Sequence, residues 1–154
     1  MTPVPSTAEV ITQRFAIIDL IVGYFAATDA KAWDVVEAFY TDDAVVRFNP
    51  ESVTTGRSAI VGFTRSMLDN DEIVTYHHIG SFTPVVAGDT AEAPVRVRAM
   101  HHGGGSRTGR FWESLAIQHT HLARTPAGWR CTGYEWQVVV GLGSLDLFEG
   151  LRPS

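Results

Sequence analysis

The stretch TAEVITQRFAIIDLIVGYFAATD, residues 7–29, decides the fold. Its apolar residues recur at alternating spacings of four and three, the pattern of one helix face, at Ile11, Phe15, Ile18, Val22 and Phe25. We expect this row to face the core. The next position on the row is Asp29, and a buried carboxylate is costly unless a partner binds it. Asp29 therefore either pairs with an inward-facing group or caps the following helix.

Length and composition indicate a single globular domain over residues 1–154, because 45% of the residues are hydrophobic. The formal net charge is −5 and no basic cluster occurs, which argues against nucleic acid as a partner. The single Cys131 excludes an internal disulfide. Residues 1–6 lack a basic leader, and no uninterrupted apolar run reaches about 18 residues. We expect a cytoplasmic protein without a membrane span.

The chain begins with helical patterns and continues with strand patterns. Ser6 and Glu9 have the spacing of a capping box at the start of the first helix. Helices are predicted over about 7–28, 32–40 and 58–68, and strands over 44–48, 74–85, 90–101, 110–123 and 129–140, followed by a tail over 141–154. This order is typical of the α+β class. A curved sheet wrapped around the first helix would leave a pocket, whose mouth the tail could cover.

Histidines on the strands are the first candidates for chemistry. Alternation places Val95 and Val97 on one strand face, opposite Arg96 and Arg98, and His101 continues the apolar face. By the same rule either His77 or its neighbour His78 could point inward. An inward histidine beside Asp29 would form a general base, because the carboxylate fixes the tautomer and the free ring nitrogen takes a proton.

Other reactive residue types have less support from their spacing. His119 and His121 lie two apart on one strand, but no third ligand has a diagnostic spacing, so no metal is expected. Ser58 and Ser114 lack the context of a nucleophile elbow, and Cys131 has the character of a small core residue. Trp112, Trp129 and Trp136 are expected in the core or in a pocket wall.

Several short motifs together resemble the SnoaL-like branch of the nuclear-transport-factor-2-like superfamily. They are Tyr24-Phe25-Ala26-Ala27-Thr28-Asp29, Trp33-Asp34, Phe39-Tyr40-Thr41-Asp42-Asp43-Ala44-Val45, Thr75-Tyr76-His77-His78-Ile79-Gly80, Gly88-Asp89-Thr90-Ala91 and Gly128-Trp129-Arg130. The resemblance implies a cone-shaped α+β barrel, in which a curved antiparallel sheet encloses the active site. It also implies a homodimer or homotrimer formed through the outer sheet face.

Within this superfamily the chain is most similar to scytalone dehydratase, hexachlorocyclohexane dehydrochlorinase and bile-acid 7-alpha-dehydratase. That likeness implies a cofactor-independent elimination in which His77 removes a proton and Asp29 orients it. It places His101 as a candidate acid for the leaving group. Tyr24 matches a pocket tyrosine, and Gln118 lies near a substrate-binding asparagine.

The chain also departs from the scytalone dehydratase pattern. Thr28 and Phe48 stand where that family has two carbonyl-polarising tyrosines, and Ala116 stands in place of a serine. Scytalone is therefore not the expected substrate. We expect a different small, hydrophobic, cyclic or polyketide-like molecule, with Phe48 and Trp112 in contact with it. One alternative is a polyketide cyclase or isomerase that uses the same pocket. The other is a non-catalytic small-molecule-binding or dimerisation module.

Overall fold

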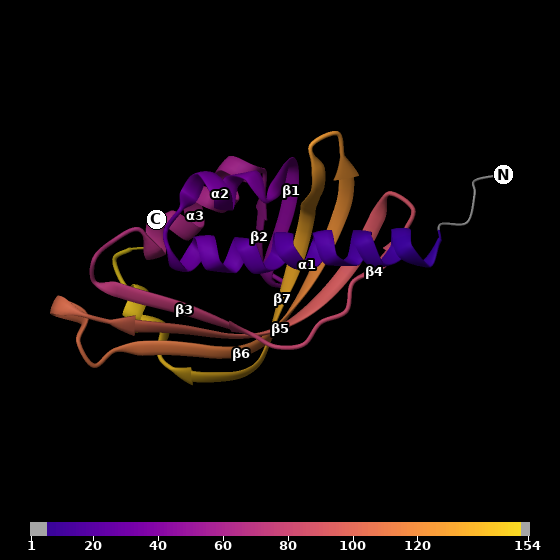
Figure 1. The fold of residues 1–154 in the computed structure, drawn as a ribbon. Helices are drawn as coiled ribbons and strands as arrows, with labels where there is room; N and C mark the ends of the chain where they lie inside the picture. Colours follow the sequence, from indigo (N-terminus) through magenta and orange to yellow (C-terminus); the bar gives the residue numbers. More distant parts are fainter. Residues whose placement is uncertain (1–5, 152–154) are drawn as a thin grey trace.

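The computed structural model describes residues 6–151 and shows helices packed on one face of a curved sheet (Figure 1). The helices are α1 (Thr7–Asp29), α2 (Trp33–Ala38) and α3 (Arg57–Leu68), with short 3-10 helices η1 (Gly105–Arg107) and η2 (Leu145–Phe148). The strands are β1 (Tyr40–Asn49), β2 (Ser52–Thr55), β3 (Ile73–Ile79), β4 (Val85–Ala87), β5 (Thr90–Gly103), β6 (Phe111–Thr125) and β7 (Gly128–Gly143). The α+β class is confirmed.

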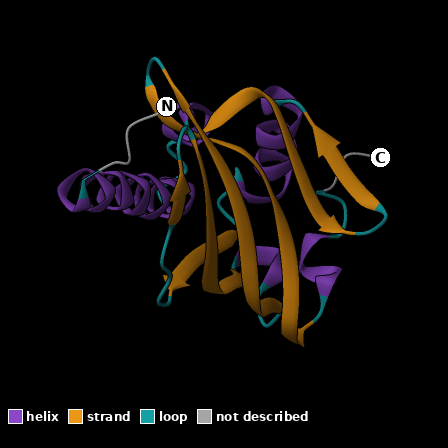
Figure 2. Cartoon of the chain, turned by 90° about the vertical axis from the view of Figure 1, so that its right-hand side faces the viewer, coloured by secondary structure: helices purple, strands orange, loops and turns teal. Residues whose placement is uncertain are grey.

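The seven strands form one mixed sheet in the order β2-β1-β7-β6-β5-β3, with β4 also paired to β5. All described pairs are antiparallel except β1 with β7, so the expectation of an entirely antiparallel sheet is wrong. The long strands curl around the helical side without closing (Figure 2). At the parallel junction, a Cβ at Gly133 would collide with the carbonyl oxygen of Val45, so the close approach requires glycine.

Helix α1 begins at the predicted capping box. The Ser6 hydroxyl accepts a hydrogen bond from the Glu9 amide, and the Glu9 carboxylate accepts one from the Ser6 amide. The helix runs across one face of the sheet and contacts β3, β4 and β7 (Figure 1). It ends at Asp29, which therefore lies beside the inner face of β3.

The buried face of α1 is not the one that the apolar row predicts. Phe15 is 62% exposed and Ile11 and Val22 are also exposed, whereas the buried positions are Ile17, Ile21, Tyr24, Phe25, Ala27 and Thr28. The helix is apolar nearly all round, so a second stripe, one residue earlier on the helical wheel, competes for the sheet. Packing selects that second stripe. Only the carboxyl-terminal end of the predicted row, Phe25 and Asp29, reaches the interior.

The strand predicted over 74–85 is two strands. β3 ends at Ile79, the amide of Gly80 still donates to Arg96 O at 2.7 Å, and the chain then leaves the ladder until Val85. Pro84 lies in this gap and has no amide to donate, which favours a break over the expected bulge. The structure also adds β2, a short strand paired to β1 that the sequence patterns did not indicate.

The interior faces follow the predicted alternation on β5. Val95, Val97 and Ala99 are buried, whereas Arg96 and Arg98 are exposed on the outer face. The main core cluster joins this inner face to α1, α2 and β1. The tail forms η2, whose Leu147 and Phe148 pack in a second cluster with Leu68 and Ile73, so the tail packs against its own domain.

By length and composition, α1 is the one helix in the described part of the chain that could span a membrane. This is weak evidence, because core helices of soluble domains meet the same two criteria. The expectation about an N-terminal leader rests on residues 1–6, of which 1–5 lie outside the described residues.

Candidate active site

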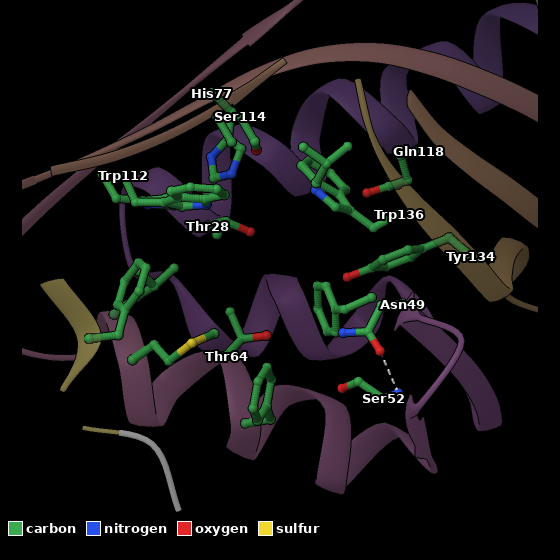
Figure 3. Close-up of a pocket in the computed structure, with 18 of the residues that line it drawn as sticks. Thr28, Asn49, Ser52, Thr64, His77, Trp112, Ser114, Gln118, Tyr134 and Trp136 are labelled. Carbon is green, nitrogen blue, oxygen red and sulfur yellow. Dashed lines mark hydrogen bonds between the residues drawn. The ribbon is translucent and has the colours of Figure 1, made fainter. Parts of the chain in front are cut away.

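A cavity of about 580 Å³ lies between α1, α3, η2 and the inner face of the sheet. Its walls combine aromatic side chains with a few hydroxyl, amide and imidazole groups. Figure 3 shows His77, Trp112 and Ser114 toward one side of the cavity and Gln118, Tyr134 and Trp136 toward the other. Among the described residues, no lysine, arginine, aspartate or glutamate lines this cavity. It is therefore suited to an uncharged, largely apolar molecule of moderate size.

Asp29 and His77 are in direct contact at the inner end of α1. His77 Nδ1 lies 2.6 Å from Asp29 Oδ1, and the His77 amide donates to Asp29 Oδ2 at 2.8 Å. Both carboxylate oxygens thus bind one residue, while α2 begins without a side-chain cap, so Asp29 is not the cap of the second helix. The carboxylate holds the proton of His77 on Nδ1, which leaves Nε2 as the nitrogen with a free lone pair.

His77 rather than His78 points inward. The His77 side chain is 8% exposed, lines the cavity, and has its ring 5.2 Å from that of Phe25. His78 is exposed on the opposite face of the same strand. This settles an orientation that the alternation of β3 left open.

His101 lies beside His77, with ring centroids 5.7 Å apart, and its ring centroid is 5.5 Å from that of Phe148. Burial away from water, reinforced by the nearby His77, lowers the pKa of His101 from 6.5 to about 3. His101 is therefore a neutral imidazole at neutral pH. It can donate one hydrogen bond to a ligand but cannot serve as an imidazolium acid.

Three tyrosine hydroxyls meet at the boundary between the cavity and the core. The Tyr40 hydroxyl donates to that of Tyr24 at 2.8 Å, and the Tyr134 hydroxyl hydrogen-bonds within the same cluster. Tyr24 and Tyr134 line the cavity, and Tyr40 lies behind them. Burial raises the pKa of Tyr24 and raises those of Tyr40 and Tyr134 well above the ordinary value, so all three remain neutral donors.

All four residues expected to contact substrate, Tyr24, Phe48, Trp112 and Gln118, line the cavity. The ring of Phe48 lies edge-on to that of Tyr134, and Gln118 Nε2 donates to the Thr120 hydroxyl at 3.0 Å. Sequence reasoning missed Tyr134, because a register shift of the β6–β7 ladder lies near Gly133 and breaks the period of two on β7. Buried Trp129 donates to Gln13, outside this cavity, whereas Trp136 lines it.

The C-terminal segment completes one cavity wall with Leu145 and Phe148. Arg107 on η1 holds this segment, since its guanidinium donates to the carbonyl oxygens of Leu147 at 2.7 Å and Glu149 at 3.1 Å. A side chain in the β5–β6 connection therefore fixes a wall built from the end of the described chain.

Of the remaining reactive residues, His119, His121 and Cys131 do not line this cavity. His119 contacts Gln137 at 3.0 Å, and His121 lies 3.9 Å from Glu92 at the exposed side of the sheet. Within residues 6–151 no three His, Cys, Asp or Glu side chains are grouped as metal ligands. Burial raises the pKa of Cys131 to about 12, so its thiol remains protonated in the core. Ser114, by contrast, does line the cavity.

Comparison with known proteins places the chain among SnoaL-like domains. An uncharacterised protein of Mycobacterium tuberculosis (strain H37Rv) is 30% identical over 125 residues, covering 81% of this chain and 84% of that protein. A candidate aromatic ring hydroxylase from Novosphingobium aromaticivorans is 27% identical, with a TM-score of 0.80 over 90% of this chain and 98% of that one.

Two further solved structures share the fold at lower identity. A candidate scytalone dehydratase from Novosphingobium aromaticivorans has a TM-score of 0.81 at 17% identity and covers 90% and 92% of the two chains. A hexachlorocyclohexane dehydrochlorinase, LinA type 2, has a TM-score of 0.78 at 14% identity and covers 97% of each. The SnoaL-like domain model matches residues 9–135, and the chain therefore belongs to the SnoaL-like domain family.

Proposed function

We propose that the protein is a cofactor-independent dehydratase that acts on a small, neutral, hydrophobic cyclic molecule. The observation that carries the proposal is the contact between Asp29 and His77 Nδ1. This contact leaves the lone pair of Nε2 free on an imidazole that lines the cavity. An uncharged aromatic wall around that imidazole favours an apolar substrate. The solved structures of the same fold that are named as a dehydratase and a dehydrochlorinase support elimination chemistry.

In the proposed reaction, His77 Nε2 takes a proton from a carbon next to a carbonyl group. The electron pair of the broken C–H bond forms a C=C bond, and the C–O bond to the leaving hydroxyl breaks. The imidazolium then returns its proton to the departing oxygen, so that water leaves and His77 is neutral again. Asp29 stabilises the imidazolium between these two transfers. Such proton transfer contributes about 10² to 10⁴ in rate.

The other groups of the cavity have supporting roles in this proposal. The hydroxyls of Tyr24 and Tyr134 are the donors for the substrate carbonyl, whose charge increases as the proton leaves. Neutral His101 donates to the leaving oxygen. Phe48, Trp112 and Gln118 contact the substrate rings.

The proposal extends to the surroundings of the protein. Exposed apolar side chains occur on the outer face of the sheet, including Val74, Tyr76, Leu115 and Val140, and they support a homodimer or homotrimer through this face. A cytoplasmic location and a role in secondary metabolism are part of the same proposal.

The test is turnover of a panel of neutral cyclic β-hydroxy ketones, with products detected by mass spectrometry. We expect loss of one water, and we expect His77→Ala to lower kcat by at least about 10²-fold. His78→Ala is the matched control, because it removes an exposed imidazole from the neighbouring position. If His77→Ala turns over a found substrate within twofold of the parent protein, the mechanism is wrong.

The same measurement separates the alternatives. A product of unchanged mass would indicate a cyclase or isomerase, and a gain of one oxygen would indicate hydroxylation, the activity named for one similar structure. A binding module would retain ligands in the cavity without converting any of them, and His77→Ala would leave its biological activity intact.

A further inference from the structure

Two buried polar atoms face the interior from paired positions of β3 and β5. Thr75 and His101 are directly opposite in the antiparallel register. The Thr75 hydroxyl and His101 Nδ1 are both buried, and neither has a hydrogen-bond partner among the described residues. Cross-strand neighbours on one face have Cβ atoms about 4.5 to 5.5 Å apart, within reach of a direct or singly water-bridged hydrogen bond.

We propose that Thr75 is a positioning residue whose hydroxyl donates to His101 Nδ1 and so fixes the proton of His101 on Nε2. The Thr75 side chain rotates to meet the ring directly or reaches it through one water. The pairing would explain the threonine of the Thr75-Tyr76-His77 motif, which otherwise has no part in the proposed chemistry.

The direction of this hydrogen bond follows from the donor count. A threonine hydroxyl has one proton and two lone pairs, and a neutral imidazole has one N–H and one lone pair. If Nδ1 donated to Thr75, the hydroxyl proton would itself need another buried acceptor. If Thr75 donates to Nδ1, the one donor left is the Nε2–H of His101, which lines the cavity and whose Nε2 is not among the buried atoms without a partner. The Thr75 oxygen then keeps only unused lone pairs, which buried groups tolerate better than an unused donor.

The consequence for the cavity is a complementary pair of imidazoles. Asp29 holds the His77 proton on Nδ1, so Nε2 of His77 is an acceptor. Thr75 holds the His101 proton on Nε2, which makes His101 a donor, and the two rings are 5.7 Å apart. This step rests on the proposed function, because only there does the donor bind the leaving oxygen while the acceptor takes the carbon-bound proton.

The test reads the tautomers directly and needs no substrate. The protein is labelled with ¹⁵N-histidine, and two-bond ¹H–¹⁵N correlations at neutral pH report which ring nitrogen carries the proton; His101→Gln assigns the His101 signals. We expect the Nε2–H tautomer for His101 and the Nδ1–H tautomer for His77. In Thr75→Val, His101 becomes a mixture of tautomers, whereas Thr75→Ser retains the original spectrum and His77 is unchanged in both variants.

Several results would overturn the proposal. Protonation of His101 on Nδ1 in the unaltered protein would refute it, whether or not Thr75→Val folds, and so would an unchanged His101 spectrum in Thr75→Val. With a found substrate, Thr75→Val should lower kcat about five-fold at nearly constant KM, and Thr75→Ser should restore it. A changed tautomer with unchanged kcat would refute the catalytic part. If His77→Ala kept full activity, the proposed function would fail, but the tautomer of His101 measured by NMR would be unaffected. The two failures are therefore distinguishable.

Discussion

Asp29 binds His77 twice, through the imidazole Nδ1 at 2.6 Å and through the backbone amide at 2.8 Å. The two bonds hold the ring and its strand to the end of α1, 48 residues away in sequence. The Asp29 side chain is 20% exposed and that of His77 is 8% exposed. A single carboxylate therefore fixes both the position and the tautomer of the proposed base.

Replacing Asp29 tests this double role. In Asp29→Asn we expect kcat to fall by about 10²-fold or more, because an amide presents its own donor to Nδ1 and no longer stabilises the imidazolium. Steady-state kinetics on a found substrate measures the effect. Asp34→Asn, an equal charge change at an exposed site of α2, is the control and should leave kcat within twofold. An equal fall in both variants would contradict the assignment.

The buried His101 makes stability depend on pH. Its pKa is about 3 in the folded protein, against an ordinary value of 6.5, so between these limits the unfolded chain binds the proton and the native state does not. Stability is therefore lost as the pH falls. Relative to His101→Gln, the unaltered protein should lose about 2 kcal/mol of unfolding free energy between pH 7.5 and 5.0. Denaturant unfolding at both values measures this, and a difference independent of pH would contradict it.

Removing one tyrosine hydroxyl at a time separates the structural role of the cluster from its proposed role in binding the substrate. Tyr40→Phe removes the donor to Tyr24 in a fully buried place, and should lower the unfolding free energy by about 1 kcal/mol. Tyr134→Phe removes a hydroxyl at the cavity wall, and should lower kcat/KM about ten-fold or more if it binds the substrate oxygen. Tyr76→Phe, on the exposed outer face, should change neither quantity. An unchanged kcat/KM in Tyr134→Phe would exclude Tyr134 as a donor to the substrate oxygen.

Arg107 should control the wall formed by the C-terminal segment. Lysine keeps the charge but cannot reproduce the forked bonds to the carbonyls of Leu147 and Glu149, so Arg107→Lys should lose about 2 kcal/mol of stability. Hydrogen exchange should become faster at the amides of Leu147 and Leu151, which bond within that segment. Arg96→Lys on the outer face is the matched control, and equal exchange in both variants would contradict the role of Arg107.

Local patterns predict much of the fold because they depend on neighbours in sequence. The capping box at Ser6 marks the start of α1, and alternation on β5 separates Val95 and Val97 from Arg96 and Arg98. The same patterns fail where two solutions are locally equivalent. Both apolar stripes of α1 satisfy helical spacing, and only contact with the sheet determines that Ile17 and Ile21 are buried while Phe15 is exposed.

For the site, the residues and their pairing come from different sources. The motifs shared with SnoaL-like proteins single out Asp29 and His77, and the likeness to scytalone dehydratase adds His101. The structure shows all three close together. Spacing could not choose between His77 and His78, nor bring Tyr134 inward, since the register shift near Gly133 changes the parity of β7.

The sequence by itself determined the α+β order of the elements, the helix start and the inward alternation of β5, because these follow from hydrogen bonding and side-chain period along a few residues. Tertiary structure decided which stripe of α1 is buried, that β1 runs parallel to β7, that Thr75 lies opposite His101, and that Tyr134 joins Tyr24 in lining the cavity. Those outcomes depend on strand register and on packing between segments tens of residues apart, which no local period encodes.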